Sequence, residues 1–278
     1  MREVRVAHES GACFGVERAL RLAYEAAEEA TAPVYTLGPL IHNPLVIADL
    51  GRAGVTPVED PLDAEEGATL LLRAHGVTPE LEQRARERGL KVVDATCPFV
   101  KKVHAGARNL MEQGYDVLVA GEKGHPEVEG TVGHAPGAHV VGGAGDVESL
   151  ELGRRVGVVS QTTLTHGVLR DVVAALVGRC EELHVMDTIC EATNRRQTAA
   201  AELAREVDVM VVVGGLNSAN TTHLADVCRM ECPRTYHVES ASHIRADWLE
   251  DASAIGVTAG ASTPAEHIRE AVKVLQTL

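Results

Sequence analysis

Three of the six cysteines, Cys13, Cys97 and Cys190, occur 84 and 93 residues apart and in the same local context. Each follows a short apolar run and precedes a stretch with the amphipathic pattern of a helix. A cysteine at a helix start favours the thiolate, because the positive end of the helix dipole stabilises negative charge. Three thiolates from three similar modules predict a metal cluster on a pseudo-threefold axis. A cubane cluster usually has four thiolate ligands, so three would leave one iron open to a substrate.

Other cysteine sites fit the sequence less well. A structural zinc site usually completes its shell with a fourth ligand, often at the short spacing of a CxxC pair, which this sequence lacks. Cys180, Cys228 and Cys232 stand outside the repeated context, so we interpret them as structural residues. A metal site at Cys228 and Cys232, one helical turn apart, is the weaker alternative because the sequence Glu-Cys-Pro predicts that the helix ends there.

Polar residues recur in the same register as the cysteines. After each cysteine the chain returns as an apolar strand that ends in a polar loop, and a second apolar strand in each third also ends in a polar residue. The offset from cysteine to first loop is 29 residues for His42 and 28 residues for both His125 and Ser218. The candidate ligand-binding residues at these strand ends are His42, His75, His125, Glu127, Thr162, Thr163, Asn217, Ser218, Asn220 and Ser262.

The elements that must position these residues alternate between strand and helix. Continuous apolar strands alternating with helices predict parallel sheets covered on both faces, and ligands of such sheets bind beyond the carboxyl ends of the strands. We therefore predict an α/β protein of three similar modules, with helices beginning near Val16, Pro98 and Glu191. The predicted modules are residues 14–96, 97–189 and 190–278, with residues 1–13 joining the third module or the centre. Three modules around one axis would direct the polar residues into one central cleft.

Composition and charge restrict the class of protein, its partners and its cellular compartment. With 278 residues, 45% hydrophobic and 24% charged, the chain has an ordinary globular composition. A net charge of −14 argues against a nucleic-acid surface, which needs clustered Lys and Arg. No apolar run approaches the roughly 20 residues that span a bilayer, and no signal peptide precedes the first strand. We therefore expect a cytoplasmic protein without membrane contact, in which cysteines serve as ligands more often than as disulfides.

Seven short segments together resemble one known family. The segments are Gly11–Val16, Arg73–Val77, Asp94–Pro98, Gly124–Gly130, Ser160–Thr163, Asp187–Cys190 and Asn217–Asn220. In the same order, they are similar to motifs of the 4-hydroxy-3-methylbut-2-enyl diphosphate reductase (IspH/LytB) family, which acts last in the methylerythritol phosphate route to isoprenoids. The resemblance runs from Cys13 to Ser262, and the HPEVEG sequence together with three correctly placed cysteines is its most specific part.

The resemblance implies a trefoil of three α/β modules around a [4Fe-4S] cluster held by Cys13, Cys97 and Cys190. It also implies that the enzyme reductively removes the allylic hydroxyl of its substrate as water, giving isopentenyl and dimethylallyl diphosphate, with ferredoxin or flavodoxin as electron donor. The open iron would bind the substrate oxygen as a Lewis acid. Glu127 is the implied proton source, acting through the substrate diphosphate, and Thr162 would orient this network.

The resemblance assigns the remaining polar residues to the substrate diphosphate. These are His42, His75, His125, Thr163, Asn217, Ser218, Asn220 and Ser262. Short neutral donors and protonatable imidazoles can bind many phosphate oxygens without the bulk of Arg. The chain departs from the family at Ala219, where a serine is usual, and at Ala12, where Phe is usual. The lost hydroxyl predicts a weaker or rearranged hold on the diphosphate and the same reaction.

Simpler interpretations exist for single residues and for the whole chain. Taken alone, His42 and His75 would be solvated loop histidines and Glu127 a surface charge. The hydroxyl residues could cap helices, namely Thr162, Thr163, Ser218 and Ser262. A cluster-based sensor would also use three or four cysteines but normally needs a basic DNA-binding element. A nicotinamide dehydrogenase needs a G-x-G-x-x-G turn after its first strand. The sequence has neither feature.

Overall fold

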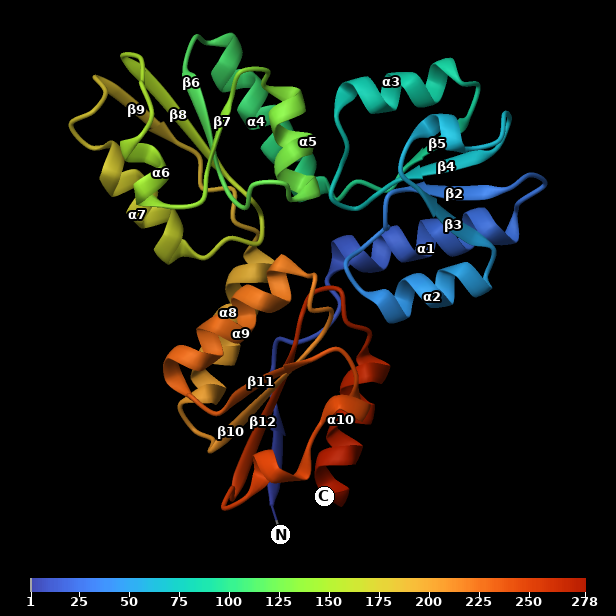
Figure 1. Ribbon diagram of the computed structural model, residues 1–278, viewed down its shortest axis with the longest axis vertical. Helices are drawn as coiled ribbons and strands as arrows, with labels where there is room; N and C mark the ends of the chain where they lie inside the picture. Colours follow the sequence, from blue (N-terminus) through green and yellow to red (C-terminus); the bar gives the residue numbers. More distant parts are fainter. Residues whose placement is uncertain (1) are drawn as a thin grey trace. The chain divides into compact units, whose positions relative to one another are not determined.

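The computed structural model describes residues 2–278 and contains three four-stranded sheets (Figure 1). All strand pairs in these sheets are parallel. Helices alternate with the strands along the chain, so the predicted α/β fold of three similar modules is confirmed. Within residues 2–278, no helix has the length and apolar character needed to cross a membrane.

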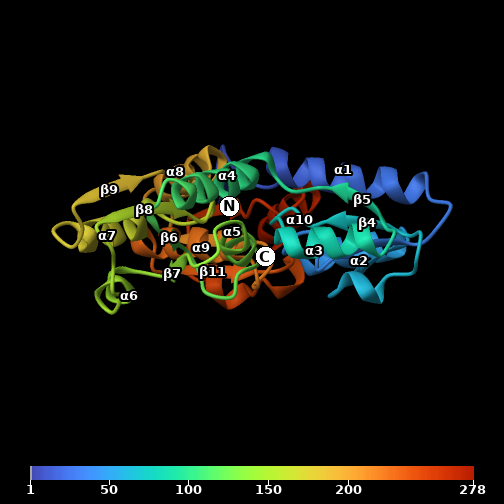
Figure 2. The ribbon, with the colours of Figure 1, turned by 90° about the horizontal axis from the view of Figure 1, so that it is seen from above.

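The first sheet has the strand order β3-β2-β4-β5. The elements of this module are α1 (Phe14–Glu28), β2 (Val34–Leu37), α2 (Pro44–Arg52), β3 (Val55–Val58), a 3-10 turn at Pro61–Asp63, β4 (Thr69–Leu72), α3 (Pro79–Glu87) and β5 (Lys91–Asp94). Both ribbon views place α1 and α3 on opposite sides of β4 and β5 (Figure 1, Figure 2). The sheet is therefore covered on both faces, as expected for parallel strands.

The second sheet has the strand order β7-β6-β8-β9. The elements of this module are α4 (Pro98–Glu112), β6 (Asp116–Ala120), α5 (Pro126–His134), β7 (His139–Val141), α6 (Ala144–Glu148), β8 (Arg155–Ser160), α7 (His166–Leu176) and β9 (Glu182–Val185). Alternate residues of its central strands face different helices. Val117, Val119 and Val159 pack with residues of α4, whereas Leu118 and Val158 pack with residues of α7.

The third sheet has the strand order β1-β12-β10-β11 and includes the first strand of the chain. Its elements are β1 (Glu3–Val6), α8 (Glu191–Ala204), β10 (Val209–Val213), α9 (Ala219–Glu231), β11 (Thr235–Val238), two 3-10 turns at Ala241–His243 and Ala246–Leu249, β12 (Ala254–Ala259) and α10 (Ala265–Thr277). Figure 1 shows α10 on one side of this sheet and α8 and α9 on the other. Accordingly, Val209, Val211 and Val213 pack toward α10, while Met210 and Val212 pack toward α8 and α9.

The three sheets share one topology. In each, the strand that directly precedes a site cysteine (β1, β5 or β9) lies at an edge, beside β12, β4 or β8 respectively. Strand β1 reaches this position from the amino terminus, pairing in register from Glu3 with Ala254 to Val6 with Val257. Each cysteine is thus delivered by an equivalent edge strand, and the module boundaries at residues 14, 97 and 190 stay a prediction.

By internal packing the chain divides into two compact units. One comprises residues 1–16, 42–46 and 191–278, and the other comprises residues 17–41 and 47–190. The first unit contains the third sheet and the second unit contains the other two sheets. The five-residue segment 42–46 therefore packs with the third sheet, although residues on both sides of it belong to the other unit.

Candidate active site

Each cysteine of the repeated trio stands immediately before a helix. Cys13 precedes α1, Cys97 precedes α4 and Cys190 precedes α8, and all three are half-buried. Cys97 is the N-cap residue of α4, with Pro98 at the first helical position. The positive end of a helix dipole suits negative charge, so equivalent helix starts are suitable positions for anionic metal ligands.

One backbone hydrogen bond fixes each cysteine in the same way. The N–H of Cys13 donates to the carbonyl of Ala261 at 3.1 Å. The N–H of Cys97 donates to Ala74 at 3.0 Å, and that of Cys190 donates to Thr162 at 2.9 Å. In all three cases the accepting residue lies two positions beyond the end of a strand, which is β12, β4 or β8 respectively. The threefold repeat in the sequence is therefore matched by a threefold repeat in backbone geometry.

The donor set fits an iron-sulfur cluster. Cys97 and Cys190 belong to one compact unit and Cys13 to the other. Within residues 2–278, no three or more His, Cys, Asp and Glu side chains are grouped as a site for a single metal ion. The candidate ligands are instead three sulfur atoms on equivalent helix starts, and soft anionic sulfur is the donor that iron clusters use.

Glu127 is a buried carboxylate held by Thr162. It lies in the first turn of α5, where the sequence predicted a loop, and only 2% of its surface is exposed. The backbone N–H of Thr162 donates to Oε1 at 2.6 Å, and the Thr162 hydroxyl donates to Oε2 at 2.8 Å. Burial raises the pKa of the Glu127 carboxyl from 4.5 to about 7, against the lowering effect of both Thr162 hydrogen bonds. This carboxyl can therefore hold a proton near neutral pH.

Two histidines lie with Glu127 in the same compact unit. His125 is the N-cap residue of α5, and its Nδ1 accepts the backbone N–H of Glu127 at 3.1 Å. Since Nδ1 is an acceptor, the neutral ring carries its proton on Nε2. His75 follows β4 and meets the His125 ring edge-on, with the ring centroids 5.7 Å apart. The structure thus brings together His75, His125, Glu127 and Thr162, all of which the sequence singled out.

Gln161 is a site-supporting residue that the sequence pattern did not single out. Its side chain is buried at 1% exposure, and its Nε2 donates to the hydroxyl of Thr163 at 2.9 Å. Its Oε1 accepts the backbone N–H of Glu122 at 2.9 Å. Gln161 therefore connects the loop after β8 with the loop after β6 through side-chain hydrogen bonds. The available signal was its position inside the Ser-Gln-Thr-Thr segment.

His104 is a second residue that the sequence pattern did not single out. It is 5% exposed on α4, and burial lowers its pKa to about 3, so the ring is neutral. A methyl group added at Gly76 would lie 2.5 Å from Cε1 of His104, and one at Gly130 would lie 3.4 Å from Nε2. Gly76 also has a φ of +77°, which favours glycine. His104 thus packs directly against the backbone of Gly76, the residue that follows His75.

The remaining candidate residues belong to the other compact unit. Ser218 is the N-cap residue of α9, where its hydroxyl oxygen accepts the N–H of Thr221 at 3.3 Å. The hydroxyl proton of Ser218 is still available to a ligand. Asn220, in the first turn of α9, and Ser262, after β12, are 8% and 9% exposed, whereas Asn217 is exposed and His42 is half-buried. The capping interpretation of Ser218 is correct and compatible with ligand binding.

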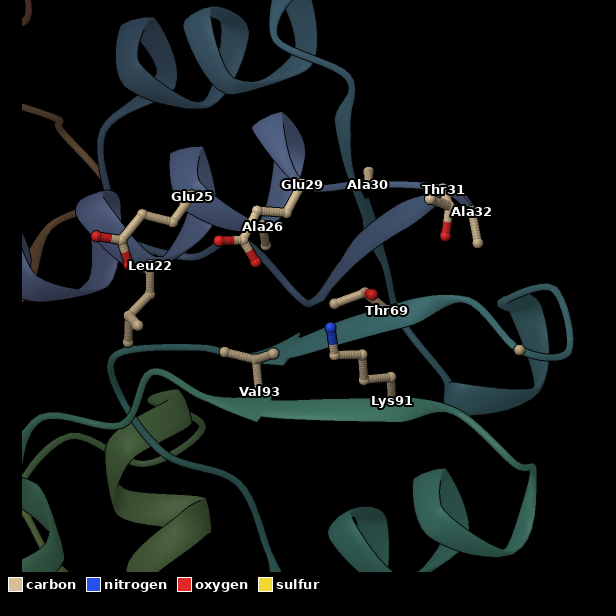
Figure 3. A pocket seen from close by; sticks show the side chains of 11 residues that line it. Leu22, Glu25, Ala26, Glu29, Ala30, Thr31, Ala32, Thr69, Lys91 and Val93 are labelled. Carbon is tan, nitrogen blue, oxygen red and sulfur yellow. The ribbon is translucent and has the colours of Figure 1, made fainter.

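A separate hollow lies at the amino-terminal ends of β4 and β5, away from the strand ends that carry the candidate residues. It has a volume of about 210 Å³ and is lined by Glu25 and Glu29 of α1 and by Thr69 and Lys91, which begin β4 and β5 (Figure 3). Ligands of parallel sheets bind at the carboxyl ends of the strands, where His75 follows β4. This hollow is therefore not part of the candidate active site.

The three parallel sheets, the equivalent cysteines at helix starts and the buried Glu127 define an α/β enzyme of three similar modules. A family model described as LytB protein matches residues 4–276. The chain therefore belongs to the LytB family. Both the fold and the family resemblance expected from the sequence are confirmed.

Similar proteins from several bacteria are named 4-hydroxy-3-methylbut-2-enyl diphosphate reductase. The relative from Geobacter sp. (strain M21) is 48% identical over 271 residues, which cover 97% of this chain and 95% of that protein. The relative from Aquifex aeolicus (strain VF5) is 42% identical over 277 residues, which cover 98% of this chain and 95% of that protein. The chain is accordingly an oxidoreductase.

Two solved structures are similar over nearly the full length. One is (E)-4-hydroxy-3-methyl-but-2-enyl diphosphate reductase, described as the terminal enzyme of the non-mevalonate pathway. It is 42% identical with a TM-score of 0.73, and the match covers 100% of both chains. The other is E-1-hydroxy-2-methyl-but-2-enyl-4-diphosphate reductase from Plasmodium falciparum. It is 29% identical with a TM-score of 0.95, and the match covers 99% of this chain and 88% of that chain.

Proposed function

We propose that the chain reduces (E)-4-hydroxy-3-methylbut-2-enyl diphosphate to isopentenyl and dimethylallyl diphosphate. Two electrons and two protons are consumed, the allylic C–O bond breaks, and the hydroxyl leaves as water. The names of the relatives supply the substrate and place the reaction last in the non-mevalonate pathway. The observation in this chain that carries the proposal is Glu127, a carboxyl that is 2% exposed and has a pKa raised to about 7.

The cofactor we propose is a [4Fe-4S] cluster with Cys13, Cys97 and Cys190 as its ligands. When bound, the cluster supplies electrons one at a time and a Lewis-acidic iron that has no cysteine ligand. The support from this chain is that its three cysteines stand at equivalent helix starts on equivalent backbone hydrogen bonds. Family membership alone implies an iron-sulfur cofactor.

Glu127 is the proton source in this proposal, and Thr162 is its positioning partner. Below about pH 7 the carboxyl holds its proton in a site closed to bulk water. It gives that proton to the substrate diphosphate, which relays it to the allylic centre. The two hydrogen bonds from Thr162 fix both carboxyl oxygens, so the proton is presented from one orientation.

The diphosphate is bound by neutral and weakly basic groups. The proposed set is His42, His75, His125, Thr163, Asn217, Ser218, Asn220 and Ser262. The neutral ring of His125 carries its proton on Nε2, because its Nδ1 accepts the backbone N–H of Glu127. Ala219 lacks the hydroxyl usual in the family, but it is the first residue of α9. The backbone N–H groups of a helix start bind phosphate well, so this end of α9 compensates in part.

Replacing Thr162 with valine tests the coupling between Thr162 and Glu127. The variant loses the hydroxyl that donates to Oε2 of Glu127 and keeps the backbone N–H that donates to Oε1. Because both bonds lower the pKa of Glu127, losing one raises it above about 7. The alkaline limb of kcat should therefore move to higher pH, by about one unit if the bond contributes about 1.4 kcal/mol. Thr165→Val, which makes the same change at the cap of α7, is the control, and equal limbs in both variants would contradict the coupling.

The electron donor we propose is a ferredoxin or a flavodoxin, and the compartment is the cytoplasm. A carrier that delivers single electrons matches a one-electron cluster. A reducing compartment keeps six cysteines available as ligands or buried thiols. Both kinds of donor are typically acidic, and so is this chain at a net charge of −14, which makes a local basic patch necessary for docking.

The proposed reaction is tested by product analysis. Anaerobically purified protein is mixed with the hydroxylated C5 diphosphate and a chemical one-electron reductant, and the diphosphates are separated by chromatography. We expect isopentenyl and dimethylallyl diphosphate to form together, with two electrons consumed per product. Unchanged substrate, or loss of the diphosphate in place of the hydroxyl, would refute the proposal.

A further inference from the structure

Asn43 is a buried amide that follows His42 directly and bonds to two parts of the chain. It is 2% exposed. Its Nδ2 donates to the carbonyl of Ser262 at 2.8 Å, across 219 positions of sequence. Its Oδ1 accepts the backbone N–H groups of Leu45 at 3.1 Å and Val46 at 3.3 Å, at the start of α2. One side chain therefore caps a helix and holds the loop after β12.

The backbone of His42 is fixed from a second direction by the loop after β10. A methyl group added at Gly215 would lie 2.7 Å from the carbonyl oxygen of His42 and 3.3 Å from Cδ of Pro44. Such contacts require glycine at this position. The same loop leads within a few residues to Ser218 at the start of α9. Residues 42–46 accordingly pack with residues 191–278 in one compact unit.

The loop that Asn43 holds carries two adjacent attachment points. The carbonyl of Ala261 accepts the N–H of Cys13 at 3.1 Å, and the next carbonyl, that of Ser262, accepts Nδ2 of Asn43. Ser262 itself is 9% exposed. A hydrogen bond to the carbonyl of Ser262 restrains the backbone of this residue and so the position from which its hydroxyl projects.

We infer that Asn43 is a positioning residue that holds His42 and Ser262 in one geometry for the diphosphate of the substrate. The inference rests on the proposed function, because that function assigns His42 and Ser262 to the diphosphate. Asn43 does not touch the substrate in this account. It pre-organises two groups from distant segments, so less conformational entropy is lost when the ligand binds.

Replacing Asn43 with aspartate separates the two roles of the side chain. Aspartate still accepts from Leu45 and Val46, and its negative charge suits a helix start. It cannot donate to the carbonyl of Ser262 and sets an oxygen against it. We expect KM for the C5 diphosphate and Kd for inorganic pyrophosphate to rise about tenfold. We expect kcat to change less than about threefold, since ground state and transition state lose the same contact.

Three further variants separate the lost donor from charge repulsion and from helix capping. Asn43→Ser keeps a short cap acceptor without charge, so an equal effect on KM shows that the lost donor, and not repulsion, is responsible. Thr165→Ala removes the cap of α7, a hydroxyl oxygen that accepts the N–H of Val168, and should lower the melting temperature without raising KM. Ser262→Ala raises KM in the wild-type background and adds little in the Asn43→Asp background, because the hydroxyl is already misplaced there.

The outcomes distinguish this inference from the proposed function. If the wild type forms product and Asn43→Asp has wild-type KM and pyrophosphate affinity, or if the Ser262→Ala effect is fully additive, the inference is wrong and the function stands. If the wild type forms no product, the function is wrong, and pyrophosphate titration decides the role of Asn43. A tenfold weaker pyrophosphate affinity in Asn43→Asp then supports the positioning role, and equal affinity overturns it.

Discussion

Glu127→Gln should lower kcat by about 10²- to 10⁴-fold, the usual contribution of a general acid. The amide has the size and shape of the carboxyl, so its oxygen still accepts the N–H of Thr162, and the Thr162 hydroxyl can turn to accept from the new amide. No transferable proton is present at that position in the variant. The fold, the brown colour expected of the iron-sulfur cluster and substrate binding should therefore remain while turnover is lost.

Glu129→Gln provides the matched control for this prediction. Glu129 lies two residues further along the same helix and is exposed, so the variant makes the same change of charge outside the buried site. It should keep near wild-type kcat. The measurement is kcat under anaerobic conditions together with the iron-sulfur absorption of each variant. If Glu127→Gln keeps more than a tenth of wild-type kcat, Glu127 is not the proton source.

The pH profile of the wild type provides a related check. Burial raises the pKa of Glu127 to about 7, so the protonated acid predominates below that pH and is lost above it. The rate should therefore fall as pH rises through about 7, and this limb should be absent from any residual activity of Glu127→Gln.

Serine at Cys13, Cys97 or Cys190 should abolish both the cluster and turnover. Each cysteine occupies an equivalent half-buried position before a helix, and a serine hydroxyl does not replace a thiolate as a cluster ligand. Two remaining thiolates leave two irons without protein ligands, so iron should be lost on purification. The measurement is iron and sulfide per chain with the visible spectrum.

Cys180→Ser is the control for the cysteine variants. Cys180 is also half-buried but lies outside the repeated context, where its Sγ contacts the carbonyl of Leu176 at 3.8 Å. A serine hydroxyl can make the same contact, so iron content and activity should be retained. Full iron content in any one of the three site variants would show that the cysteine concerned is not a ligand.

Much of the fold was predictable because the hydrophobic pattern repeats with the cysteines. The long apolar runs that became β6, β8, β10 and β12 indicated parallel strands, and the helix starts at Pro98 and Glu191 were correct. The edge strands β3, β7 and β11 were missed. They are short, and β3 also contains Pro57, which an edge strand tolerates because proline has no N–H to donate and the outer side of an edge strand needs none.

The site was predictable in its residue types but not in its contacts. Strand ends gave the positions of His75, Thr162 and Ser262, since these follow directly from topology. The burial of Glu127 depends on packing between α5 and the end of β8, which no local pattern encodes. The same is true of Asn43, whose partner lies 219 positions away.

The most direct test of the central claim is to measure turnover against bound iron in the same anaerobic samples. Protein is prepared with increasing cluster content, from fully chelated to fully reconstituted, and each sample is assayed with the hydroxylated C5 diphosphate. We predict that product formation rises in proportion to iron and saturates at about four iron per chain, the content of one cubane cluster. A colourless, iron-free sample that forms the two C5 diphosphates at the full rate would contradict the account.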